Sequence, residues 1–153
     1  MRPQTLHVSD ALPFLLGTWQ LRRSIEDHRA AISGSFVGEA TLFGTSAIST
    51  PAELQRARYH EVGELQFGAC RGPARRTLEY VRLDDASVLL CFANGRPYID
   101  LDLSTGACDR IHDCGEDRYE IHVVVKSRDL VEERWVVQGP QKDYEALATL
   151  TRC

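Results

Sequence analysis

The hydrophobic and polar residues of this chain alternate with a period of two over most of its length. In segment 17–26, Trp19, Leu21 and Ile25 share one face with Arg23, and polar residues occupy the opposite face. Such alternation is typical of a β-strand that buries one side. The pattern therefore predicts a first strand whose apolar face is interrupted by one charge.

The same alternation recurs along the chain and predicts about ten short strands in all. The further strands are expected at 35–43, 58–67, 76–83, 87–93, 97–103, 109–113, 118–126, 130–138 and 144–152. Turn residues separate successive runs at hairpin spacing, and Asn94-Gly95 is the clearest hairpin signal. A short helical turn is expected at 11–16, capped by Ser9 or Asp10, and segment 45–55 resembles a flexible connection.

No helix long enough to cross between parallel strands is predicted, so the strands should pair as antiparallel neighbours. We expect an all-β fold, with one antiparallel barrel domain over residues 1–153 and a short N-terminal helical turn. A barrel removes open sheet edges and leaves room for a small ligand, whereas a sandwich with Greek-key crossings is the rival fold. Gly38 and Gly63 are expected positions for a β-bulge, and Gly38 also suggests a close backbone approach.

The composition excludes several classes of protein. The chain has 153 residues, and 18 Lys and Arg against 22 Asp and Glu give a formal net charge of -4. This balance argues against a nucleic acid or an anionic membrane as partner. No spanning helix or signal peptide is predicted, so we expect a cytoplasmic location, in which the five cysteines are reduced and buried as small apolar residues.

The start and end of the predicted barrel resemble the calycin pattern. Leu16-Gly17-Thr18-Trp19 enters the first strand, and Arg152 lies at the end of the last. In calycins a Gly-x-Trp tryptophan packs against a basic residue of the terminal strand, so the resemblance implies that Trp19 and Arg152 close one end of the barrel.

A longer set of motifs covers almost the whole chain and resembles a family of uncharacterised small proteins with a calycin-like, lipocalin-like β-barrel. The motifs include Gly17-Thr18-Trp19, Asn94-Gly95-Arg96-Pro97, His112-x-Cys114-Gly115-x-Asp117-x-Tyr119 and Trp135-x-Val137-x-Gly139-Pro140-x-Lys142-Asp143-Tyr144. The family has no established activity, so this resemblance implies a barrel fold and no reaction.

A ligand site inside a barrel needs an apolar lining and a few converging polar groups. An inward Arg23 requires either a carboxylate partner or an anionic ligand. Glu61, which shares a face with Tyr59, is a candidate partner, and a purely structural ion pair between Arg23 and Glu61 is the alternative. The candidate ligand-binding residues are Arg23, Tyr59, Glu61, Tyr80, His112, Cys114, Tyr119, Trp135 and Lys142.

His112 and Cys114 share a strand face and allow three interpretations: ligand contacts, a metal site with Cys108, or simple packing. Cys108-x-x-x-His112-x-Cys114 lacks the paired, closely spaced ligands of structural zinc, so no metal is expected. Haem ligation through His112 is the cofactor alternative, implied by the haem-binding nitrobindins among the calycins. A polar face with Arg23 and Glu61 favours a smaller ligand, so no cofactor is expected.

No motif of a serine hydrolase, zinc protease, phosphate loop or dinucleotide-binding protein is present in the sequence. Our first hypothesis is therefore a protein that binds a polar or anionic small organic molecule inside the barrel. The alternatives are a cofactor-independent lyase or isomerase using Glu61, His112 and Tyr119, haem binding, and a scaffold whose interior is filled by its own side chains. A homodimer is left open.

Overall fold

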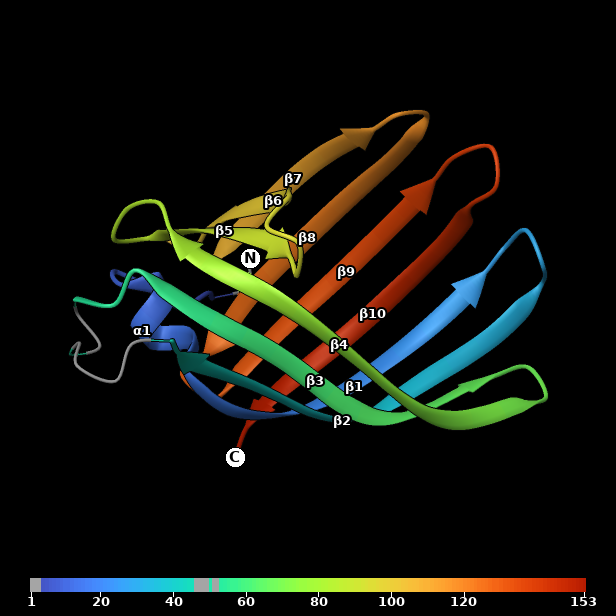
Figure 1. Ribbon diagram of the computed structural model, residues 1–153, viewed down its shortest axis with the longest axis horizontal. Coiled ribbons are helices and arrows are strands. Elements are labelled where there is room, and N and C mark those ends of the chain that lie inside the picture. The colour runs from blue at the N-terminus through green and yellow to red at the C-terminus, as the bar shows by residue number, and fades with distance from the viewer. Residues whose placement is uncertain (1–3, 46–49, 51–52) are drawn as a thin grey trace.

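One antiparallel sheet and one short helix form the framework of the protein in a computed structural model that describes residues 4–45, 50 and 53–153. The elements are α1 (Ala11–Leu15), β1 (Gly17–Asp27), β2 (Ile32–Gly44), β3 (Arg56–Phe67), β4 (Cys70–Arg82), β5 (Ser87–Phe92), β6 (Pro97–Asp102), β7 (Ala107–Cys114), β8 (Asp117–Ser127), β9 (Leu130–Gln138) and β10 (Asp143–Arg152) (Figure 1). The predicted all-β antiparallel fold with a short N-terminal helix is confirmed. Most of the connection expected at 45–55 lies outside the described residues.

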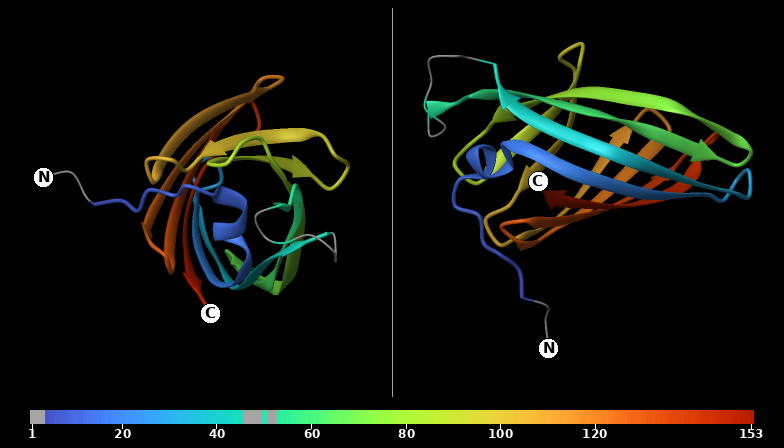
Figure 2. Two further views of the ribbon diagram at one scale, coloured as in Figure 1. Left: turned by 90° about the vertical axis from the view of Figure 1, so that its left-hand side faces the viewer. Right: turned by 90° about the horizontal axis from the view of Figure 1, so that it is seen from below.

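The sheet curls until its two outer strands come close together. Its strand order is β6-β5-β4-β3-β2-β1-β10-β9-β8-β7, so the first and last strands of the chain pair in the middle. The hydrogen-bonded ladder does not continue from β6 to β7 in the described part of the chain. The result is a nearly closed barrel with one seam, which Figure 2 shows from one end and from below.

The strands differ from prediction mainly at β4, which begins at Cys70 and not at residue 76. The added half of β4 contains Gly72 and Pro73, which lie before the predicted strand 76–83. It pairs with β3, from Phe67↔Cys70 onward, whereas β5 pairs only with Leu78–Arg82. Because this half of β4 has no β5 neighbour, it behaves as an edge strand, which is where proline is tolerated.

Gly38 and Gly63 do not form the predicted bulge. They are direct partners in a continuous β2–β3 register, and a Cβ built on Gly38 would lie 2.6 Å from the Gly63 Cα. The two glycines therefore allow a close backbone approach, as expected for Gly38. The register shifts lie instead between Leu90 and Cys91 and between Val125 and Ser127.

One end of the barrel is closed by α1 and Arg152. The Arg152 guanidinium lies 4.1 Å from the centre of the Trp19 ring and donates hydrogen bonds to the carbonyls of Leu16 (2.9 Å) and Phe14 (2.8 Å). The Trp19 Nε1 donates to the Leu15 carbonyl at 3.0 Å. These contacts attach the helical turn to β1 and β10 and shield the apolar interior at this end.

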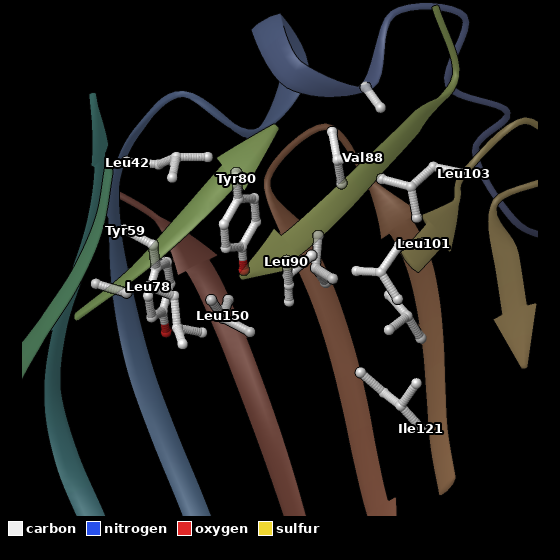
Figure 3. Close-up of a cluster of buried hydrophobic side chains, with 14 of the residues drawn as sticks. Leu42, Tyr59, Leu78, Tyr80, Val88, Leu90, Leu101, Leu103, Ile121 and Leu150 are labelled. Atoms are coloured by element: carbon white, nitrogen blue, oxygen red, sulfur yellow. The ribbon is translucent and has the colours of Figure 1, made fainter. Parts of the chain in front are cut away.

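Behind this closure, the buried side chains of the strands form a continuous apolar core (Figure 3). It includes the stacked rings of Tyr59 and Tyr80, whose centres are 5.4 Å apart. Cys91 and Cys108 are buried as predicted, but Cys70, Cys114 and Cys153 are exposed because they lie at the ends of β4, β7 and the chain.

The segment before α1 bridges the β6–β7 seam at the closed end. The Val8 N–H donates to the Leu103 carbonyl after β6 (3.1 Å), and the Leu6 N–H donates to the Val125 carbonyl of β8 (2.9 Å). Gly106, in the β6–β7 turn, lies so close that an added Cβ would be 2.4 Å from the Leu6 carbonyl oxygen. The N-terminal segment thus replaces the missing β6–β7 ladder at this end.

Gly106→Ala tests this bridge against Gly95→Ala as a matched control. Both glycines have positive φ, 79° and 87°, but a Cβ on Gly95 meets nothing within 4 Å. We expect Gly95→Ala to lower the free energy of unfolding by about 1 kcal/mol through backbone strain alone. Gly106→Ala should cost about 1–3 kcal/mol more, because it also displaces Leu6. If urea denaturation gave the same loss of unfolding free energy for both variants, a structural role for the N-terminal segment would be contradicted.

Candidate functional site

A buried carboxylate joins three strands near the middle of the barrel. Glu61 of β3, only 4% exposed, accepts two hydrogen bonds from Arg23 of β1, with nitrogen–oxygen distances of 3.0 and 3.1 Å. The Tyr59 hydroxyl donates to the same carboxylate at 2.6 Å. The carboxylate partner predicted for Arg23 is thus Glu61, and the fork geometry fixes β1 relative to β3 across β2.

This environment sets the protonation of the cluster. Burial alone would raise the pKa of Glu61, but the hydrogen bond from Arg23 and the charges of Arg76 and Arg23 outweigh it, so the pKa lies below its ordinary value. Burial, followed by the negative charge of Glu61, raises the pKa of Tyr59. Glu61 therefore stays ionised and Tyr59 stays neutral at physiological pH.

A second arginine reaches the same carboxylate but is not satisfied by it. The Nε of Arg76 in β4 lies 3.4 Å from Glu61 Oε1. This Nε is buried and has no hydrogen-bond partner among the described residues. Oε1 of Glu61 accepts one hydrogen bond, from Arg23, and Oε2 accepts two, from Arg23 and Tyr59. The Arg76 Nε makes only an ion pair with Oε1, on a side chain that is still 40% exposed.

Both arginines line a pocket at the end of the barrel away from α1. It has a volume of about 190 Å³. Its lining is Arg23, Ile25, Arg76, Tyr98, Trp135, Val137, Tyr144 and Ala146. An aromatic and apolar wall thus surrounds two converging guanidinium groups, which is the composition expected of a site for an anionic organic group.

A separate, much smaller void lies at the closed end, between Trp19, Tyr59, Tyr80 and Glu133. Its volume of about 30 Å³ is enough for one or two water molecules but not for an organic ligand. Tyr59 and Tyr80 therefore lie deeper than the pocket, and Tyr59 contacts the site through Glu61.

Tyr98 of β6 holds the aromatic wall together across the seam. Its ring stacks on Trp135 with a centroid distance of 5.3 Å and meets the edges of Tyr119 and His112 at 5.7 and 6.1 Å. Trp135, one of the candidate ligand-binding residues, is thus part of the cavity wall. His112 and Tyr119 stand behind Tyr98, outside the lining of the arginine pocket.

Two other candidates lie away from the pocket. Cys114 is exposed where β7 ends and does not line the arginine pocket, and the ligand contact expected of it stays a prediction. Lys142 donates a hydrogen bond to the Tyr119 hydroxyl (2.8 Å) and pairs with Asp117 (3.1 Å). These partners raise the pKa of Lys142, with the Tyr119 hydrogen bond as the main cause. Lys142 is therefore a protonated residue of the rim with its own partners.

Among the polar and aromatic residues that line the pocket, sequence reasoning missed Arg76, Tyr98 and Tyr144. Arg76 shares the inward face of β4 with Leu78 and Tyr80, so the same alternation could have identified it. Tyr98 follows the Asn94-Gly95 turn, and its inward position depends on the register shift after Leu90, which the sequence does not reveal. No cluster of three or more metal-ligating side chains occurs within the described ranges.

The fold and the interior define an antiparallel, nearly closed ten-stranded barrel with a charged pocket at its wider end. Comparison with family models adds the family: residues 15–152 match a family of unknown function, DUF6314, and the chain belongs to it. No curated protein matches the sequence. In the part of the chain that the structure describes, no helix is long and apolar enough to cross a membrane.

Solved structures show the same fold at low sequence identity. The S-type phycobiliprotein lyase CPES from Guillardia theta is 13% identical, with a TM-score of 0.60 over 93% of this chain and 90% of that chain. A de novo designed fluorescence-activating β-barrel is 15% identical, with a TM-score of 0.50 over 94% of this chain and 98% of that chain. These similarities support the barrel fold.

Glu61→Gln tests the importance of the buried carboxylate, and Glu64→Gln, on the outer face of the same strand, is its control. Removing the charge of Glu61 leaves Arg23 buried without a counter-ion, which should lower the free energy of unfolding by about 3–5 kcal/mol. Glu64 forms only an exposed pair with Arg71, so its substitution should cost less than about 1 kcal/mol. If urea denaturation gave the same loss of unfolding free energy for Glu61→Gln and Glu64→Gln, the stabilising role of the buried carboxylate would be contradicted.

The lowered pKa of Glu61 also predicts a pH dependence. A carboxylate with a depressed folded-state pKa stabilises the fold above its unfolded pKa, ordinarily 4.5, and loses that contribution as the pH falls through the folded value. The stability difference between wild type and Glu61→Gln should therefore shrink as the pH is lowered from about 6 to about 3. A difference that stays constant in urea denaturation across this range would show that Glu61 is not stabilised as an anion.

Proposed function

We propose that this protein binds a small organic anion in the pocket at the wider end of the barrel. Arg76 carries the proposal, because its guanidinium lines an apolar pocket with a buried donor that lacks a hydrogen-bond partner among the described residues. An unpaired buried donor is costly, and a carboxylate, sulfonate or phosphate at this position would satisfy it.

The two arginines have different roles in this proposal. Arg23 is 13% exposed and donates to both oxygens of Glu61, so it supports the site and contributes positive charge. Arg76 is more exposed, and among the described residues it has only an ion pair with Glu61, so its guanidinium can orient a ligand. Tyr98, Trp135 and Tyr144 supply the apolar wall.

The geometry favours binding over the alternatives. A general acid or base works best with a pKa near the operating pH, but Glu61 is buried, fully hydrogen-bonded and held ionised. Haem ligation through His112 is also disfavoured, because His112 lies behind Tyr98 and the pocket is smaller than the ~300–1,000 Å³ usual for drug-sized ligands. The fold shared with a phycobiliprotein lyase and a fluorescence-activating barrel is consistent with an interior that holds a small molecule.

A titration with 8-anilinonaphthalene-1-sulfonate, an aromatic organic anion, tests the proposal by fluorescence. Arg76→Gln should weaken its binding at least tenfold, which corresponds to about 1.4 kcal/mol. Arg75→Gln is the matched control, because Arg75 is the exposed neighbour on the outer face of β4. Arg76→Lys should retain partial binding, since the positive charge remains but the planar guanidinium, which can bind an anion through two nitrogens, is lost.

Thermal unfolding of each variant separates a binding defect from a folding defect. Equal affinities of wild type and Arg76→Gln for the probe, with both proteins folded, would overturn the assignment of Arg76. Equal weakening by Arg75→Gln would indicate a general charge effect and would contradict a specific site.

A further inference from the structure

The arginine pocket is too small to enclose most organic anions completely. Its volume of about 190 Å³ lies below the ~300–1,000 Å³ of typical ligand pockets. A ligand anchored at Arg76 would therefore extend beyond it. The direction of this extension depends on which surfaces next to the pocket are apolar and uncovered.

A second hollow lies farther along the same hairpin. It has a volume of about 260 Å³ and is lined by Leu65, Phe67, Cys70, Arg71, Gly72 and Pro73. Leu65 and Gly72 are register partners and lie on the same inward face as Glu61 and Arg76. Ala74, the next inward residue of β4, lies between this hollow and Arg76, so small or apolar side chains connect the two sites.

The hairpin offers enough length for an extended ligand. At about 3.3 Å per residue, the inward face of β4 from Arg76 to Cys70 spans about 20 Å. A Cβ added to Gly72 would meet no atom within 4 Å, which means that the inner face is open there. Because β5 pairs only with Leu78–Arg82, no strand in the described part of the chain covers the other edge of this half of β4 (Figure 1).

We propose that the ligand is an amphipathic organic acid, bound with its anionic group at Arg76 and its apolar body along the inner face of the β3–β4 hairpin toward Leu65. This inference rests on the proposed function and adds the class and orientation of the ligand. The acid end is enclosed, and one side of the body stays accessible to solvent. The protein thus presents the apolar part of its ligand at an open edge of the barrel.

The acid end is tested with cis-parinaric acid, a fluorescent unbranched acid, and its methyl ester, which lacks the negative charge. Wild type should bind the acid at least tenfold more tightly than the ester. Arg76→Gln should bind both forms with equal affinity, because the discrimination comes from the arginine. Preference for the acid that persists in folded Arg76→Gln would overturn the proposed orientation.

The position of the apolar body is tested with Gly72→Phe, which places a ring in the second hollow, where an added Cβ would meet no described atom within 4 Å beyond its chain neighbours. This variant should weaken binding of cis-parinaric acid at least fivefold and change binding of the compact anion 4-bromobenzoate, measured by calorimetric titration, less than twofold. Arg75→Phe, on the outer face of β4, is the control and should change neither.

The two probes distinguish failure of this inference from failure of the proposed function. Unchanged binding of cis-parinaric acid in Gly72→Phe, with the compact anion still dependent on Arg76, would overturn the hairpin placement and leave the anion site standing. Loss of dependence on Arg76 for both probes would overturn both. Thermal unfolding confirms that each variant is folded at the titration temperature.

Discussion

The buried carboxylate of Glu61 is the interaction on which the interior of this barrel depends. A charge in an apolar interior is strongly unfavourable unless it is paired and hydrogen-bonded, and Glu61 is both, through Arg23 and Tyr59. The fork between Arg23 and Glu61 fixes which faces of β1 and β3 turn inward. The Arg76 Nε pairs with Glu61 by charge but forms no hydrogen bond with a described residue, so the guanidinium of Arg76 stays available on the open side.

Unequal strand lengths determine where the interior is accessible. The β3–β4 hairpin is about twice as long as β5 and β6, so the barrel is enclosed near α1 and open at the opposite end (Figure 1). The closed end is sealed by Arg152 and Trp19 and by the N-terminal segment that bridges the seam. The open end has no such cover over β4, and the charged pocket lies at this transition.

The sequence was a reliable guide where regular alternation continued. The all-β fold and the facing pair of Arg23 and Glu61 followed from the period of two, because each strand buries one face. The N-terminal helical turn followed from the capping residues before it. Prediction failed at the start of β4, where Gly72 and Pro73 resemble a turn but lie on a strand without a second neighbour.

Contacts between distant segments were also beyond sequence reasoning. The hydrogen bonds of Leu6 and Val8 across the seam join segments about one hundred residues apart and leave no local pattern. The inward position of Tyr98 depends on a register shift in the β5–β6 hairpin. A distant contact also changes the predicted role of Asp10. Asp10 is at the N-cap of α1, but its side chain makes no capping hydrogen bond. It pairs instead with Arg82 of β4, at 2.9 Å.

A crystal structure of the protein with 4-bromobenzoate would test the central claim most directly, because the anomalous signal of bromine locates the ligand. The account predicts the carboxylate at the guanidinium of Arg76, the ring against Trp135 and Tyr144, and the Arg23–Glu61 pair unchanged. A carboxylate bound elsewhere, or an Arg76 side chain turned away from the pocket, would contradict it.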